Sequence, residues 1–137
     1  RARQGSTRSP QWTHGGIALG PKPRTYRVSI NKKVKKLAMI SALSSKVANG
    51  EMVVIDQISA TEYKTKNMVN MLNAIGFKKK ALVVLDSNDE KVLKSFANIP
   101  GVKTALSNTI NVYDILNNDM FVVAKAACEK IEEVYAK

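Results

Sequence analysis

The first fifty residues of this 137-residue chain contain no aspartate and no glutamate. They carry eleven lysines and arginines, whereas residues 51–137 carry eleven basic and eleven acidic residues, so the whole net charge of +11 lies in the N-terminal part. A short run of lysines is usually just a solvated surface. Fifty residues without an acid, with arginines spread among glycines, instead favour a polyanionic partner, and nucleic acid in particular.

Residues 1–30 show neither helical nor strand periodicity. They contain four of the seven glycines and three of the four prolines, residue types that break helices and favour turns. The segment is too polar to bury the apolar surface that would offset its ordering entropy. We therefore predict an extended basic arm at residues 1–30, ordered only by a partner, and a globular domain at residues 31–137.

The globular part alternates between strand and helix patterns. Short apolar runs, typical of strands, occur in EMVVIDQ, KKALVVLD, VKTAL and DMFVVA. Helical patterns occur in KTKNMVNMLNAIG, SNDEKVLKSFANI, NVYDILNN and KAACEKIEEVYAK. Continuous apolar strands alternating with helices indicate parallel strands covered on both faces. The sequence predicts an α/β fold: a small doubly wound, mainly parallel sheet flanked by helices, with a long irregular basic N-terminal extension.

The first helix is expected to begin after Asn31, as N-cap, and to stop at Gly50. Its expected apolar face consists of Val34, Leu37, Ala38, Leu43 and Val47. In the second helix we expect inward-facing Met68, Leu72 and Ile75, with Gly76 closing it. In the third we expect Ser87 or Asn88 as the cap.

An enzyme of this fold class would need a recognisable site. The turn after the first strand, DQISATEYKTK, has no glycine and cannot cradle a dinucleotide or a nucleotide phosphate. Asp56 and Asp86 end two strands, where carboxylates can be catalytic, although caps and turns are their commoner role. With one histidine, His14, and one cysteine, Cys128, a His/Cys metal site is implausible. We expect Cys128 to be a small core residue. We expect the chain to have no catalytic residue and to bind no metal or cofactor.

Arginine forks bind phosphates and stack on bases. Trp12, the only tryptophan, either stacks on an unpaired base or folds back onto the domain. Lysines in the first turns of a helix oppose its dipole, a cost that a docked anion would remove. No element fits a DNA major groove, so structured RNA is preferred. The candidate RNA-binding residues are Arg1, Arg3, Arg8, Trp12, Lys22, Arg24, Arg27, Lys32, Lys33, Lys35 and Lys36.

The segment RARQGSTRSPQWTHGG, followed by GPKPRTY, resembles the signature loop of the bacterial type of large-subunit ribosomal protein four, the universal L-four family. The segments NKKVKKLAMISALSSK, KTK, NIPGVK and NVYDIL also match in register, so the resemblance covers essentially the whole chain. The family has a further N-terminal part, with a strand, the outgoing arm and the loop tip. This chain therefore resembles the C-terminal two-thirds of the family, including part of its exit-tunnel loop.

The resemblance implies a structural, non-enzymatic constituent of the large ribosomal subunit. Its body would lie on the outside of the subunit, and its arm would run into the RNA, aid assembly and help line the peptide exit tunnel. By position, Arg1, Arg3, Arg8 and Trp12 would lie in the RNA-embedded arm. Lys22, Arg24 and Arg27 would lie on its return to the body.

Implied partners are large-subunit ribosomal RNA of the 23S type, neighbouring ribosomal proteins and, as in some bacterial members of the family, the leader messenger RNA of its own operon. The implied location is cytoplasmic, in the ribosome, and no apolar run approaches the roughly 18 residues of a membrane span. Two alternatives stay open: an α/β nucleotide-binding enzyme domain with a basic tail, and a messenger-RNA-binding translational repressor.

Overall fold

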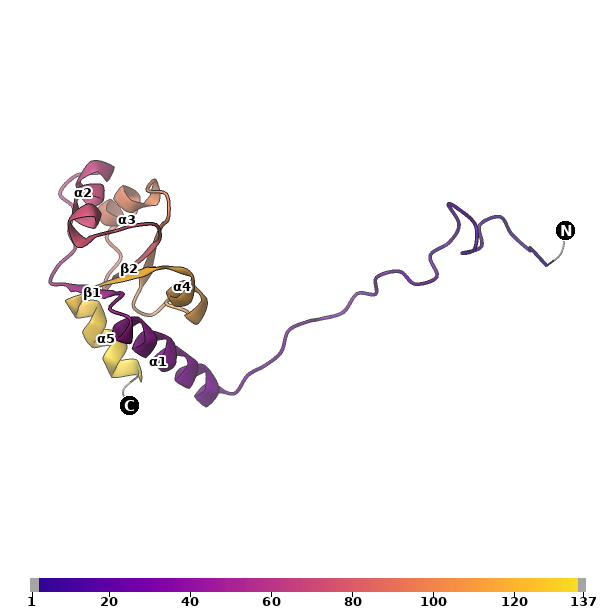
Figure 1. Ribbon diagram of the computed structural model, residues 1–137, viewed down its shortest axis with the longest axis horizontal. Coiled ribbons are helices and arrows are strands. Elements are labelled where there is room, and N and C mark those ends of the chain that lie inside the picture. Colours follow the sequence, from indigo (N-terminus) through magenta and orange to yellow (C-terminus); the bar gives the residue numbers. More distant parts are fainter. Residues whose placement is uncertain (1–2, 136–137) are drawn as a thin grey trace.

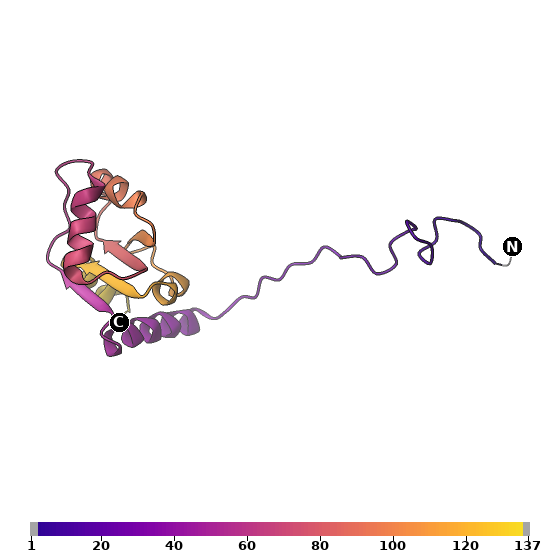
Figure 2. The same cartoon turned by 45° about the horizontal axis from the view of Figure 1, so that its top comes forward.

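The computed structural model describes residues 3–135, so the candidate contact Arg1 lies outside the described residues. It shows an extended N-terminal arm that leads into a body of one sheet and its flanking helices (Figure 1). No helix or strand occurs within residues 3–30, and this arm projects away from the body in two views (Figure 1, Figure 2). The elements of the body are α1 (Lys32–Ala48), β1 (Met52–Ile55), α2 (Thr65–Ile75), β2 (Ala81–Leu85), α3 (Glu90–Ala97), β3 (Val102–Leu106), α4 (Val112–Asn117), β4 (Met120–Ala124) and α5 (Lys125–Tyr135).

The sheet is entirely parallel, with strand order β1-β4-β2-β3. Helices α2 and α3 carry the chain from β1 through β2 to β3 and pack on one face. Helix α4 returns the chain to β4 and packs, with α1 and α5, on the other face. The predicted doubly wound parallel sheet is therefore confirmed.

The central strands β2 and β4 are covered by helices on both faces of the sheet, which explains why their sequences are almost continuously apolar. In β2, Leu82 and Val84 pack toward α1, α4 and α5, whereas Val83 and Leu85 pack toward α2 and α3. Strand β4 alternates in the same way, and Phe121 packs on the face that is covered by α1, α4 and α5. A strand covered on both faces buries every side chain, so it shows a continuous apolar run rather than an alternation.

Most helix ends agree with the sequence signals. Asn31 occupies the N-cap position of α1, and Gly76 ends α2 in the left-handed conformation with φ of 88°. The expected cap of α3 at Ser87 or Asn88 is wrong. The cap is Asp89, whose Oδ1 accepts a hydrogen bond of 2.9 Å from the backbone N–H of Lys91. An aspartate here also places negative charge at the positive end of the helix dipole.

The expected apolar face of α1 is also wrong. Met39, Ala42 and Lys46 are the buried residues of this helix, whereas Val34, Leu37 and Val47 are half or more exposed. Of the expected face, only Leu43 packs against the core. Apolar residues occur around most of the circumference of α1, so the contacts with the body, and not the helical period, select the buried face.

Lys46 fixes the C-terminal end of α1 to the body. Its side chain is 8% exposed, and its Nζ lies 2.6 Å from Glu51 Oε2 and donates to the carbonyl oxygen of Asn118 at 2.7 Å. A weaker contact of 3.4 Å reaches the carbonyl oxygen of Asp119. A buried lysine is tolerated only when its charge is paired and its protons are used, as they are here.

Candidate nucleic-acid interface

Within the described part of the arm, residues 3–30, the hydrogen bonds are internal. Every backbone hydrogen bond that begins within residues 3–30 also ends there. Arg8, Lys22 and Arg27 are exposed and form no ion pair within the described residues. The arm sequence offers no carboxylate, and the arm extends away from the body (Figure 1). These cations are therefore available to an external anion.

Two aromatic side chains lie among the cations of the arm. Trp12 is 46% exposed, and the arm in which it lies extends away from the body (Figure 1). The guanidinium of Arg24 lies 4.4 Å from the centre of the Tyr26 ring, within cation–π range. Exposed aromatic faces beside guanidinium groups are the surfaces on which unpaired bases stack.

Residues 8–16 close into a compact loop, which we call the arm loop. The N–H of Gly16 donates to the carbonyl oxygen of Arg8 at 2.7 Å, and two shorter turns lie inside this closure. His14 adopts the left-handed conformation with φ of 64°, which histidine tolerates better than most residues. A Cβ on Gly15 would collide with the carbonyl oxygen of Ser9, so this position requires glycine.

The rest of the arm spaces its cations along an extended line. Lys22, Arg24 and Arg27 lie in a stretch without secondary structure, residues 17–30, in which a fully extended chain spans up to about 50 Å. The structure does not gather these side chains into one pocket, and Arg3 is also separate, near the N-terminal end with φ of 58°. Cations strung along a line suit a long polyanion and not a single phosphate.

The basic start of α1 continues this surface into the body. Lys32, Lys33 and Lys35 are exposed and Lys36 is half-buried. Asn31 makes no side-chain cap hydrogen bond, and the first turn contains no acid. The free N–H groups and the lysine amines therefore combine into a positive helix end, the arrangement that binds phosphate oxygens.

The carboxyl end of the sheet, where doubly wound folds commonly bind ligands, has the opposite charge. A hollow of about 380 Å³ lies there, and Asp56, Asp86 and Asp89 line it. Lys130 donates to the carbonyl oxygen of Asp86 at 2.9 Å and lies 3.8 Å from its carboxylate. Clustered carboxylates repel phosphates, so this edge is unsuited to a nucleotide. Within residues 3–135, no three His, Cys, Asp or Glu side chains are grouped to hold a metal ion.

Cys128 is half-buried beside the groove between α1 and α5 and is only partly the core residue that we expected. Burial raises the pKa of its thiol, and the neighbouring carboxylates of Glu132 and Glu129 raise it further. A raised pKa leaves less thiolate at neutral pH, and the thiolate is the nucleophile. The environment of Cys128 is therefore that of an unreactive cysteine.

Comparison with known proteins decides the family. The model of the ribosomal protein L4/L1 family matches residues 1–134. The chain belongs to this family. The resemblance noted in the sequence is thereby confirmed. No helix within the described part of this L4/L1 chain is long and apolar enough to cross a membrane.

Relatives within the L4/L1 family are close. The large ribosomal subunit protein uL4 of Ruminiclostridium cellulolyticum is 56% identical over 136 residues, which cover 99% of this chain and 66% of the relative. The proteins of the same name from Alkaliphilus metalliredigens and Clostridium acetobutylicum are each 54% identical with the same coverage. The chain therefore spans 66% of the length of these curated relatives.

One exposed group of cations is not among the RNA-binding residues predicted from the sequence. Lys78, Lys79 and Lys80 are consecutive and exposed between α2 and β2. The sequence does contain this run of three lysines, but the net charge of zero over residues 51–137 gave no indication of a local positive surface. Two carboxylates, Glu51 and Asp119, line the same hollow as Lys78 and Lys80, and Glu51 is already paired with Lys46.

Proposed function

We propose that this chain is a structural, non-enzymatic constituent of the large ribosomal subunit that binds large-subunit ribosomal RNA through its arm and the basic start of α1. The observation that carries the proposal is the arm itself, free of carboxylates and extended away from the body, with cations that have no acidic partner among the described residues. The names of the relatives support the assignment to the large subunit. Neighbouring ribosomal proteins and a location in cytoplasmic ribosomes follow as parts of the same proposal.

The physical basis of the binding is counterion release. Each phosphate neutralised by an arginine or lysine frees condensed cations, which makes affinity fall steeply as salt rises. An extended arm reaches many phosphates in succession, and its glycines let the backbone pass where side chains would clash. Prolines reduce the conformational entropy that binding removes. The family resemblance adds the finer proposal that the arm contributes to the wall of the exit tunnel.

The two alternatives fare differently. The nucleotide-binding enzyme is disfavoured because the carboxyl edge of the sheet carries three aspartates and no phosphate cradle. A messenger-RNA-binding repressor would use the same arm, and no feature of the structure favours it over the ribosomal role. Quantitative capture with intact large subunits and with free leader transcripts would rank the two RNA partners.

Crosslinking tests the proposal directly. Ultraviolet crosslinking of the chain to large-subunit ribosomal RNA is expected to give adducts within residues 1–36, because these residues carry the arginines of the arm, Trp12 and the basic helix start. Co-sedimentation with large subunits should persist after a high-salt wash if the arm is threaded through folded RNA. Adducts confined to the carboxyl edge of the sheet, around Asp56 and Asp86, would contradict the proposal.

A glycine substitution tests whether the shape of the arm loop matters. We expect Gly15→Ala to weaken RNA binding by about tenfold, roughly 1.4 kcal/mol, because the added Cβ collides with the Ser9 carbonyl and opens the loop. Gly5→Ala is the matched control, since no atom lies within 4 Å of a Cβ at that position. Filter binding measures both affinities. Equal affinities for the two variants would show that the loop conformation is irrelevant to binding.

A further inference from the structure

The edge of the sheet at which the strands begin carries a surface that the proposed function does not use. We call it the amino edge. It is rich in lysine, asparagine and glycine but also holds two carboxylates, and it comprises Asn49, Gly50, Glu51, Gly76, Lys78, Lys79, Lys80, Gly101, Lys103, Asn117, Asn118 and Asp119. These residues come from the ends of α1, α2 and α4 and from the starts of β2 and β3. Segments far apart in the sequence therefore meet here.

Lys80 lies at the centre of the amino edge, between two hollows. One, of about 370 Å³, is lined by Lys78 and Lys80 together with the backbone of Gly50 and Gly76. The other, of about 220 Å³, is lined by Lys80 and Lys103. Both are shallow surface depressions rather than enclosed cavities, so they suit a ligand that lies across the surface.

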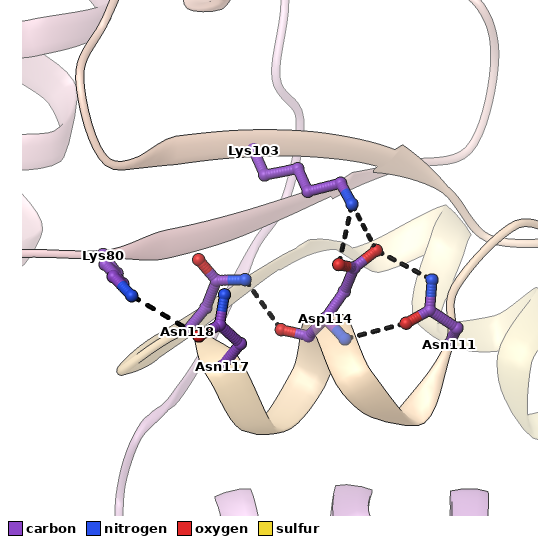
Figure 3. Close-up of polar contacts among 6 residues, drawn as sticks. All are labelled: Lys80, Lys103, Asn111, Asp114, Asn117 and Asn118. Atoms are coloured by element: carbon purple, nitrogen blue, oxygen red, sulfur yellow. Dashed lines mark hydrogen bonds and ion pairs between the residues drawn. The ribbon is translucent and has the colours of Figure 1, made fainter. Parts of the chain in front are cut away.

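The cations at this edge are largely free to bind. Lys78 and Lys79 form no hydrogen bond or ion pair with any residue from 3 to 135. The amine of Lys80 makes one long contact, of 3.4 Å, with the neutral Oδ1 of Asn117 (Figure 3). An exposed amine without a carboxylate partner keeps its full charge for an external anion.

The acids at this edge are mostly already neutralised. Asp114 is buried, and both its carboxylate oxygens accept hydrogen bonds of 2.7 Å from Lys103, whose side chain is 56% exposed (Figure 3). One oxygen of Glu51, Oε2, lies 2.6 Å from Lys46 Nζ, and the Glu51 side chain is 39% exposed. Asp119 is the remaining carboxylate among the residues lining the two hollows. The body is therefore polarised, with positive charge at the amino edge and aspartates at the opposite, carboxyl edge.

The glycines keep the amino edge open. All three glycines of the body, Gly50, Gly76 and Gly101, have positive φ and lie beside these hollows. The turns after α1 and α2 account for the first two. A Cβ at Gly50 or Gly76 would project into open space, so the absence of side chains leaves the backbone accessible. The amides of Asn49 and Asn117 add hydrogen-bond donors of the kind that contact phosphates and ribose hydroxyls.

We propose that the amino edge is a second RNA-binding surface, which contacts the ribose-phosphate backbone separately from the arm. The inference rests on the proposed function, since it takes RNA as the partner. Helix α1 links the two surfaces. Lys46 fixes its C-terminal end to the residues beside the amino edge, and the arm leaves its N-terminal end, about 25 Å away for 17 helical residues. A rigid spacer of this length raises the effective concentration of one surface once the other is bound.

A charge-matched pair of variants of the full chain tests this surface. In the edge variant, Lys78, Lys79 and Lys80 are all replaced by glutamine. In the control variant, Lys66, Lys94 and Lys125, which are exposed on other parts of the body, are replaced by glutamine, so the net charge changes equally. The probe is large-subunit ribosomal RNA transcribed in vitro. We expect the edge variant to bind about tenfold more weakly, with the slope of log affinity against log salt reduced by about 2, and the control to change little.

Trp12 lies in the arm, so the quenching of its fluorescence at saturating RNA reports arm binding separately, and it should be unchanged in the edge variant. Equal weakening of the two triple variants would overturn the proposal, because it would reflect net charge alone. Unchanged binding of the edge variant, alongside weakened binding of an arm variant, would also overturn it while leaving the proposed function intact. Weakening of the edge variant alone, with the arm variant binding normally, would support the amino edge and refute the role of the arm.

Discussion

Replacing Arg3, Arg8, Lys22, Arg24 and Arg27 together with glutamine is expected to weaken binding to large-subunit ribosomal RNA by roughly a hundredfold or more at 0.15 M salt. These side chains are exposed along the arm and form no ion pair in the described structure. If each contacts one phosphate, the slope of log affinity against log salt should fall by about 4. Filter binding across a salt series measures both quantities.

The same five substitutions should leave the body intact. Among residues 3–135 no hydrogen bond joins the arm to the body, so the thermal midpoint, followed by far-ultraviolet circular dichroism, should change by no more than a degree or two. A matched control replaces five body lysines with glutamine, namely Lys64, Lys66, Lys91, Lys94 and Lys125. An unchanged salt slope in the arm variant, or a large fall in its thermal midpoint, would contradict an arm that is free until it binds RNA.

Replacing Lys46 with methionine is expected to lower the free energy of unfolding by about 2–4 kcal/mol. Methionine fills much of the same volume, but the buried carbonyl of Asn118 loses its donor and Glu51 loses its counter-charge. Glu51 is 39% exposed and keeps part of its hydration, which places the expected cost below that of a fully buried pair. Urea denaturation followed by circular dichroism is the appropriate measurement, because the only tryptophan lies in the arm.

Lys94→Met is the control for this prediction. Lys94 pairs with Glu90 one helical turn earlier, and both side chains are more than half exposed. Exposed pairs of this kind contribute about 0.3–0.5 kcal/mol. A loss at Lys46 no larger than the loss at Lys94 would mean that the contacts of Lys46 do not hold α1 on the body.

Local signals explain why the elements of the body were predictable. Gly76 ends α2 because glycine, which has no Cβ, adopts the left-handed conformation without a steric penalty. The five consecutive apolar residues of β2 indicate a strand that is buried on both faces of the sheet. The arm cations were recognisable as candidate RNA contacts because no acid accompanies them in the sequence, and their contact with RNA stays a prediction. The cap of α3 was misplaced because Ser87, Asn88 and Asp89 are all acceptable caps, and the geometry of the turn after β2 selects among them.

What the sequence determined by itself is local in origin: the class of the fold, the order of helices and strands, and the absence of helical or strand periodicity in residues 1–30. These follow from backbone propensities, apolar periods and net charge within short windows. The tertiary structure decided the strand order, the face of α1 that is buried around Met39 and Lys46, and the gathering of Lys80, Lys103 and Asn117 at one edge. Such features depend on contacts between distant segments, whose energies are set jointly by both partners and are absent from either segment alone.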